Sequence, residues 1–317
     1  MIRRIWRALR QSKSTEFRVL EHRVQQLAAF QARLLRHVAG SAPVQSNCED
    51  PNFGIKSEVC KQRHFTLPEY HRWCDRLAES PKYHRKQWEF VFAGVAFERA
   101  GAIRTGARAL GFGVGREPIP AALAAAGVSV MATDLDVSKA VQAGWVHVGQ
   151  HANEIDVLHR PNLIDLKTFR ERVEFRTVDM NAIPDDLRNF DMVWSSCAFE
   201  HLGSIELGKK FVQRAMDCLR PGGVAVHTTE FNLEDGETIE HGSTVLFRKR
   251  DIEDLSNRLK VGGHEVAQLD LSLGDDLIED FVDMPPYRDN MHLRLMIERF
   301  VTTSIGLVIR AGSRKLA

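Results

Sequence analysis

The stretch that most constrains the fold runs from Ala109 to Pro118 and reads Ala-Leu-Gly-Phe-Gly-Val-Gly-Arg-Glu-Pro. It follows a short apolar run and precedes an alanine-rich segment, residues 121–126, which predicts a helix. A second apolar run then ends in Asp134, 23 residues after Gly111. A strand, a glycine turn, a helix and a second strand closed by an acid form the plan of a nucleotide-binding βαβ unit.

The glycines of this stretch suit a turn that a ligand can approach closely. Glycine adopts positive φ angles cheaply, and its missing Cβ leaves room beside the backbone. The dinucleotide-binding fingerprint places its third glycine three residues after the second, to admit a pyrophosphate. Here Arg116 occupies that position, and the third glycine comes early, at Gly115. The turn therefore departs from the pyrophosphate-binding pattern.

The G-x-G-x-G pattern, followed by a strand that ends in Asp, resembles class I S-adenosylmethionine-dependent methyltransferases. The resemblance covers about residues 85–312. It implies an α/β fold, a Rossmann-like, seven-stranded, doubly wound sheet, with S-adenosylmethionine as the cofactor. An ordinary glycine turn in another α/β protein is the alternative. The predicted strands are residues 107–112, 128–134, 173–179, 190–195, 224–231, 264–271 and 301–310.

The resemblance also implies a set of cofactor contacts. It assigns the turn to the methionine and adenosine parts, and the acid after the second strand to the ribose hydroxyls. It assigns the acid after the third strand to the adenine amino group, with a methionine beside the ring, and a serine to the floor near the methyl group. These residues are Gly111, Phe112, Gly113 and Gly115, then Asp134 with Leu135, Asp179 with Met180, and Ser195 followed by Ser196.

One position departs from the family pattern. Two residues before the first glycine the family usually has an acid, which helps to bind the ammonium group of the cofactor, and this chain has Ala109. A buried ammonium without a partner is costly. We predict that Glu117, two residues past Gly115, takes this role, because the start of that helix faces the same end of the ligand. The alternative is that Glu117 only stabilises a helix N-terminus.

Candidate catalytic residues follow two of the predicted strands. After strand 190–195 the chain reads Ser-Cys-Ala-Phe-Glu-His-Leu, which places Glu200 and His201 at the start of a helix. Strand 224–231 carries Glu230 to the same carboxyl edge, where ligands of open α/β sheets bind. Because histidine titrates near neutrality, we predict His201 as the base that takes the acceptor's proton, oriented by Glu200 or Glu230. The alternative is that His201 helps build the site without abstracting a proton.

A magnesium-assisted reaction is a further alternative. Some family members hold magnesium with Glu-x-x-Glu-His and a later His. Here Cys197 stands in place of the first acid, although Glu230 or His241 could complete a set with Glu200 and His201. With one ligand missing, we predict no metal.

The five cysteines are odd in number and unevenly spaced, which predicts reduced thiols in the cytoplasm rather than a disulfide framework. Four Cys and His residues read C-x3-H-x6-H-x2-C, namely Cys60, His64, His71 and Cys74. This spacing matches no common zinc finger, so we expect no zinc site there.

The remaining sequence divides the chain into three parts. Residues 1–40 predict a basic helical or coiled-coil extension, residues 41–65 a linker, and residues 66–317 the methyltransferase domain. Apolar residues fall at heptad spacing in the extension: Phe17, Leu20, Val24, Leu27, Leu34 and Val38. Packing on its own domain and dimerisation through residues 17–38 both remain open. A third option is binding to anionic lipid through an apolar face beside arginines, formed by Ile2, Ile5, Trp6 and Leu9.

Charge and apolar runs exclude two classes of protein. The net charge is +1, and residues 1–43 carry nine Arg or Lys and two Glu, so the remainder is net acidic and no nucleic-acid partner is expected. No apolar run approaches the ~18 residues that span a bilayer. We expect a cytoplasmic protein, possibly at the inner face of the membrane.

The substrate class is expected from analogy. The chain is similar in general character to bacterial methyltransferases that decorate surface polysaccharide, which implies O-methylation of a sugar, a glycan or another small hydroxylated substrate, perhaps beside a glycosyltransferase. A catalytically silent scaffold with the same fold is the alternative. Two long polar segments, 145–170 and 272–298, are expected to shape the substrate pocket, with Pro285–Tyr287 as a rigid turn.

Overall fold

The computed structural model of the 317-residue chain describes residues 2–40, 42–136 and 155–313. In the N-terminal helix, side chains are described from residue 17 to residue 37 except at residue 21. The predicted lipid-binding face of Ile2, Ile5, Trp6 and Leu9 therefore lies outside the described side chains, as does Val38. His147, His151 and Asn153 of segment 145–170 lie outside the described residues.

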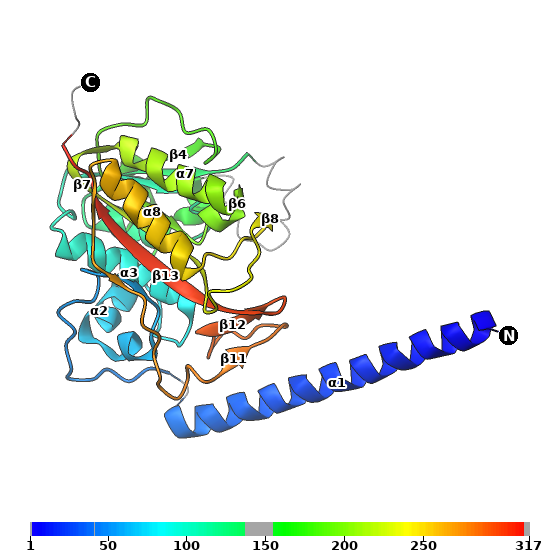
Figure 1. The fold of residues 1–317 in the computed structure, drawn as a ribbon. Coiled ribbons are helices and arrows are strands. Elements are labelled where there is room, and N and C mark those ends of the chain that lie inside the picture. The colour runs from blue at the N-terminus through cyan, green and yellow to red at the C-terminus, as the bar shows by residue number, and fades with distance from the viewer. Residues whose placement is uncertain (1, 41, 137–154, 314–317) are drawn as a thin grey trace.

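A mostly parallel sheet forms the centre of the molecule (Figure 1). Its central order is β4-β3-β2-β5-β7-β13, in which the first five strands run parallel and β13 is antiparallel to β7. The order reverses beside β2, which is where ligands bind in open α/β sheets. This topology confirms the predicted Rossmann-like fold. The bounds are β2 (Arg108–Phe112), β3 (Ser129–Asp134), β4 (Val173–Thr177), β5 (Phe190–Ser196), β7 (Leu219–Asn232) and β13 (Phe300–Arg310).

Helices cover both faces of this sheet. Neighbouring strand residues point to opposite faces, so Ala109 joins one hydrophobic cluster and Leu110 the other. The first cluster includes residues of α2 (Pro68–Arg76), α3 (Arg85–Arg99), α4 (Ile119–Ala125) and α6 (Leu166–Arg172). The second includes residues of α7 (Ile205–Ala215) and α8 (Lys249–Val261). Short 3-10 helices complete the layers: η1 (Gln62–Thr66), η2 (Ile155–Leu158), η3 (Phe199–His201) and η4 (Met216–Cys218).

The edge of the sheet beyond β13 differs from the expectation. Strand β1 (Ser57–Val59) pairs antiparallel with β13 and parallel with β10 (Leu269–Asp270), and β9 (Glu265–Val266) pairs with the end of β13. The predicted strand 264–271 is thus split in two. Residues 41–65, expected as a linker, contribute β1 and bury Phe53 and Phe65 completely. The residues typical of a linker lie before residue 57, and the residues of β1 that follow them enter the sheet.

Two further pairs of strands extend this architecture. β12 (Arg294–Ile297) pairs antiparallel with β13 and parallel with β11 (Val282–Asp283). β6 (Gly203–Ser204) and β8 (His241–Gly242) form a separate two-stranded sheet. The turn between β11 and β12 includes the cis peptide bond Pro285–Pro286.

The N-terminal extension is a single helix, α1 (Ile2–Ala39), that projects away from the body of the protein (Figure 1). Among its described side chains, the buried ones are Ala28, Ala32 and Leu35, close to its C-terminal end. The apolar residues at heptad spacing are exposed, including Phe17 (68%) and Leu27 (67%). Within the described residues, no helix is both long enough and apolar enough to cross a bilayer.

Close packing of α3 on β13 generates a first prediction. A Cβ added at Gly306 would lie 2.1 Å from Cε1 of Phe92, a buried ring of α3. We therefore expect Gly306→Ala to lower the free energy of unfolding by about 1–3 kcal/mol through overpacking, as measured by urea denaturation. Gly236→Ala is the control, because an added Cβ there meets nothing within 4 Å. Equal stabilities of the two variants would contradict this account of the α3–β13 contact.

Candidate active site

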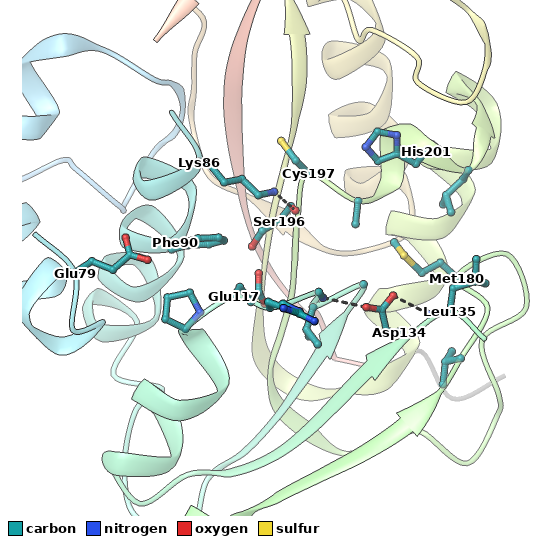
Figure 2. Close-up of a pocket in the computed structure, with 18 residues that line it drawn as sticks. Glu79, Lys86, Phe90, Glu117, Asp134, Leu135, Met180, Ser196, Cys197 and His201 are labelled. Carbon is teal, nitrogen blue, oxygen red and sulfur yellow. Dashed lines mark hydrogen bonds between the residues drawn. The ribbon is translucent and has the colours of Figure 1, made fainter. Parts of the chain in front are cut away.

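A cavity opens at the carboxyl edge of β2, β3 and β5 (Figure 2). It lies where the strand order reverses, at the position expected for a ligand of this fold. Asp134, Leu135 and Met180 lie at one end, and Glu79 and Phe90 at the other. The described residues that line it are Glu79, Lys86, Phe90, Gly113 to Pro118, Asp134, Leu135, Val178, Met180, Ser196 to Ala198, His201 and Leu202.

The glycine turn has the shape that a close ligand requires. Gly113 has a φ of 59°, and a Cβ added there would lie 2.9 Å from the Cβ of Ala198. The Asp134 carboxylate holds the turn: Oδ2 accepts the backbone N–H of Gly115 at 3.1 Å, and Oδ1 accepts that of Leu135 at 2.7 Å (Figure 2). These two bonds place the Asp134 carboxylate beside the glycine turn on the cavity wall. The predicted role of Asp134 toward the ribose hydroxyls stays a prediction.

Three residues that were predicted to contact the cofactor do not line the cavity and instead pack in the protein core. Gly111 lies against Trp194, since an added Cβ would be 2.3 Å from the indole ring. Phe112 is fully buried and packs edge-on against Phe211. Ser195 is also buried, and its hydroxyl shares a hydrogen bond with Nδ1 of His227 at 2.8 Å.

Ser196, one residue further along β5, lines the cavity. Alternation along a strand explains the correction, because neighbouring side chains point to opposite faces. Ser195 therefore does not form the floor near the methyl group. Asp179 is half-buried between Val178 and Met180, two lining residues, and its Oδ1 accepts the backbone N–H of Asn181 at 3.0 Å.

Glu117 is a buried acid that lines the cavity. Glu117 is 5% exposed, and its carboxylate accepts a hydrogen bond from the indole N–H of Trp194. Burial raises the pKa of Glu117 to about 8. Ala109, at the position of the family's acid, is completely buried in β2. Glu117 is thus a buried carboxyl on the cavity wall, and its predicted role toward the ammonium group of the cofactor stays a prediction.

His201 sits on the other side of the cavity, in η3. Its Nδ1 lies 2.8 Å from the carbonyl oxygen of Ser243. A carbonyl only accepts, so Nδ1 carries the ring proton of the neutral imidazole. Burial lowers the pKa of His201 to about 4, so the ring is neutral at pH 7. The orienting group is therefore the Ser243 carbonyl, which the sequence analysis did not identify.

Glu200 is fully buried behind His201. The hydroxyl of Thr229 donates to Oε2 at 3.1 Å, and Oε1 lies 3.9 Å from Nε2 of His201. Burial raises the pKa of Glu200 to about 7. Glu200 is close to the histidine but does not fix its ring, because the 3.9 Å separation is too long for a hydrogen bond.

Glu230 belongs to a buried ion cluster rather than to His201. The guanidinium of Arg85 pairs with Glu230 and donates to Oε1 of Glu89 at 3.0 Å. The Nζ of Lys86 donates to the carbonyl of Ser196 at 2.7 Å and lies 3.2 Å from Glu89 (Figure 2). Partners from β5, β7 and their own helix hold Arg85 and Lys86 in this cluster. Glu230 therefore does not orient His201.

The residues near Glu230 do not fit a magnesium ion. Ligand atoms of Cys197, Glu200 and Glu230 lie within 4.8 Å of one another, and His201 is not in this group. Magnesium prefers an octahedral shell of oxygen ligands and water. Here one ligand is a thiol, and Arg85 already neutralises Glu230. His241, the other proposed ligand, is exposed on β8.

His64, one of the four Cys and His residues singled out by their spacing, contacts two other side chains. His64 is buried, accepts the indole N–H of Trp88 at 3.0 Å, and its Nε2 lies 3.2 Å from Glu58. Among the residues that the structure describes, the Cys60, His64, His71 and Cys74 side chains form no metal-ligand group.

The cavity wall also includes residues that sequence reasoning missed. Glu79 and Phe90 come from the region of α3, and Arg116 from the turn itself. None of residues 155–170 and 272–298 lines this cavity, so these described parts of the two segments do not shape it as expected. Instead, Asp283 of β11 binds Arg288 and His292, which ties the 272–298 segment to itself.

The family model described as a methyltransferase domain matches residues 110–227, which include the glycine turn, Asp134 and His201. A 1,6-didemethyltoxoflavin N1-methyltransferase from Burkholderia thailandensis, solved with 1,6-didemethyltoxoflavin and S-adenosylhomocysteine, is 16% identical over 86% of this chain and 95% of its own, with a TM-score of 0.43.

Two further solved structures are similar. An S-adenosylmethionine-dependent methyltransferase from Clostridium acetobutylicum is 15% identical over 77% of this chain and 98% of its own, with a TM-score of 0.40. The [4+2]-cyclase SpnF is 14% identical over 78% of this chain and 94% of its own, with a TM-score of 0.44. No curated protein matches the chain.

The buried ion cluster generates a second prediction. We expect Arg85→Met to lower the free energy of unfolding by about 3–5 kcal/mol, because it leaves Glu89 and Glu230 buried without their guanidinium. Urea denaturation at pH 7 measures the loss. Arg76→Met is the matched control, since Arg76 pairs with Glu98 at the surface, where such pairs contribute up to about 1 kcal/mol. A loss for Arg85→Met no larger than for the control would disprove the bridging role.

Proposed function

We propose that this chain, whose residues 110–227 match the methyltransferase domain model, is a class I S-adenosylmethionine-dependent methyltransferase. We propose further that it transfers the methyl group to a hydroxyl oxygen of a sugar, a glycan or another small hydroxylated acceptor. The observation that carries the proposal is His201, a neutral imidazole on the wall of the cavity, with its tautomer set by the Ser243 carbonyl. A hydroxyl acceptor must lose a proton as it attacks, and a positioned imidazole suits that task.

The cavity residues fit the cofactor. Gly113 provides a cradle that a Cβ would fill, and Glu117 is a buried carboxyl suited to a cation. We propose that Asp134 binds the ribose hydroxyls, Asp179 the adenine amino group, and Met180 the face of the adenine. When bound, S-adenosylmethionine supplies an activated methyl group. The protein's own task is then to hold the acceptor in line and to receive its proton.

The acceptor side of the cavity lies above the end of β5. Lys86, Cys197 and His201 gather there, away from Asp134 and Leu135 (Figure 2). Lys86 is held in place by Glu89 and the Ser196 carbonyl, so its ammonium is a fixed polar group. A polar wall of this kind supports a small hydroxylated acceptor, and the net acidic remainder of the chain disfavours nucleic acid. The scaffold alternative lacks support, since the glycine turn, Asp134 and Glu117 are all in place.

The third prediction concerns His201. Incubation with S-adenosylmethionine and a panel of glycosides, nucleotide sugars and amines should give O-methylated products, detected by mass spectrometry. We expect His201→Ala to lower kcat by about 100-fold to 10,000-fold, the range of general acid–base catalysis. Since the pKa of His201 is lowered to about 4, the wild-type kcat should fall only as the pH drops toward that value and the base is protonated.

The control for His201→Ala is His241→Ala, which changes an exposed histidine on β8. Binding of S-adenosylhomocysteine, measured by calorimetry, should be the same in both variants. Methylation of amines in preference to hydroxyls, or an unchanged kcat in His201→Ala, would refute the proposed acceptor chemistry. Cofactor binding without turnover on any acceptor would favour the scaffold.

We also propose that α1 pairs with α1 of a second copy of the chain. The exposed side chains of α1 that share heptad spacing are Phe17, Leu20, Val24, Leu27 and Leu34, and among its described side chains the buried ones are Ala28, Ala32 and Leu35. The alternative binding partners of this basic helix with exposed apolar residues are a membrane surface and a glycosyltransferase.

The fourth prediction tests this pairing. Leu20→Glu with Leu27→Glu should convert the dimer to a monomer in light scattering after gel filtration, because charges at heptad core positions are costly to bury. Arg18→Glu with Arg33→Glu, on the polar positions of the same helix, should leave the dimer intact. A monomeric wild-type protein would rule out self-pairing and leave the membrane or the glycosyltransferase as occupant.

A further inference from the structure

Glu117 differs from the other buried acids around the cavity in its partners. Glu89 and Glu230 both contact Arg85, whereas Glu117 accepts a hydrogen bond from a neutral group, the indole N–H of Trp194. Among the described residues, no cation lies within ion-pair distance of Glu117. Its carboxyl is therefore a cavity-lining acid that forms no ion pair with the residues that the structure describes.

Trp194 explains why the acid sits on the turn rather than on β2. Trp194 pairs with Gly111 in the sheet register, and its ring packs against the Gly111 backbone. Ala109, two residues before, is fully buried among apolar side chains. The indole fills the space beneath the turn and directs its N–H at Glu117. The tryptophan thus fixes where the carboxyl points.

Several charged groups from neighbouring elements lie near Glu117 or line the same cavity. Lys86 and Glu89 face it from α3, and Ser196 from the end of β5. Asp134 on β3, Glu79 before α3 and Arg116 beside Glu117 line the same cavity. The ammonium of Lys86 is committed to Glu89 and to the Ser196 carbonyl. Burial outweighs these groups and raises the pKa of Glu117 to about 8, so the carboxyl is mostly protonated at pH 7.

We propose that Glu117, positioned by Trp194, is the counter-charge for the ammonium group of the cofactor and stays a neutral carboxylic acid until that cation binds, so that binding expels a proton. The inference rests on the proposed function in that it takes the methionine end of S-adenosylmethionine as the ligand of Glu117. It makes cofactor capture pH-dependent through a residue of this chain that the family pattern does not contain.

The direction of the pH effect follows from the raised pKa of Glu117. Below about pH 8 the free protein must lose a proton to form the ion pair, so each pH unit lower weakens binding about tenfold. Affinity should therefore rise from pH 6 to pH 8 by about 100-fold. The free protein shows the opposite trend: a raised carboxyl pKa is stabilising near pH 4.5 and below, and this stabilisation is lost as the pH rises through about 8.

Calorimetric titration with S-adenosylhomocysteine, which carries the same ammonium group, tests the inference. In phosphate and in Tris at pH 7, the difference in binding heat gives the number of protons released, and we expect nearly one in the wild type. Glu117→Gln should release none and should bind about 100-fold more weakly than the wild type at pH 8. At pH 6 the two affinities should converge, since the wild type is then protonated too.

Three controls separate this role from a structural one. 5′-Methylthioadenosine lacks the amino acid end, so it should bind equally to wild type and Glu117→Gln with no proton release. Glu79→Gln, which alters another acid of the cavity, should keep the proton release. Trp194→Phe removes the N–H donor, which should shift the pH midpoint of binding upward and weaken binding several-fold at pH 7 but little at pH 9. Thermal unfolding of each variant checks that it is folded.

The outcomes are distinguishable. If the wild type binds S-adenosylhomocysteine with no buffer-dependent heat, or if Glu117→Gln releases the same number of protons, the inference is overturned while the proposed function stands. If the wild type does not bind S-adenosylhomocysteine at any pH from 6 to 9, the proposed function itself fails. An unchanged pH midpoint in Trp194→Phe overturns the positioning role of the tryptophan.

Discussion

The Arg85 guanidinium is the contact on which the architecture of the active site depends. It joins α3 to Glu230 of β7 and to the hydroxyl of Ser304 on β13, and it shares Glu89 with Lys86. Buried charges are tolerated only when they are paired and hydrogen-bonded, so these partners fix the start of α3 against the carboxyl edge of the sheet. Lys86 is thereby held over the end of β5, where its ammonium reaches the Ser196 carbonyl. The wall of the cavity follows from this cluster.

The cluster also divides the buried acids into two kinds. Glu89 and Glu230 neutralise Arg85 and Lys86, which leaves Glu117 and Glu200 without a cation of their own. Burial then raises the pKa of both acids, to about 8 and about 7. Burial therefore favours the protonated form of both carboxyls, Glu117 on the cavity wall and Glu200 beneath it beside His201. A ligand that brings positive charge changes their protonation, which couples the site to pH without any movement of the backbone.

Local patterns predicted the parts of the structure that depend on neighbours in sequence. The glycine turn, the strand bearing Asp134 and the position of His201 were predicted because turn chemistry and apolar periodicity are local properties. Ser195 was misassigned because successive side chains of a strand point to opposite faces of the sheet, so an error of one residue places the wrong side chain in the cavity. The pairing of Arg85 could not be predicted because its partner Glu230 lies 145 residues away in the chain. Strand β1 was missed because three residues carry no detectable period, and only pairing with β13 makes them a strand.

The protonation states around the cavity bear on the accepting atom. An amine acceptor is an ammonium ion at neutral pH and must lose a proton before its nitrogen can attack. A hydroxyl enters without charge, and its proton leaves only as the new bond forms. His201 is neutral and held by the Ser243 carbonyl, so it can accept that proton without first losing one. The electrostatics of the site therefore support an oxygen acceptor over an amine.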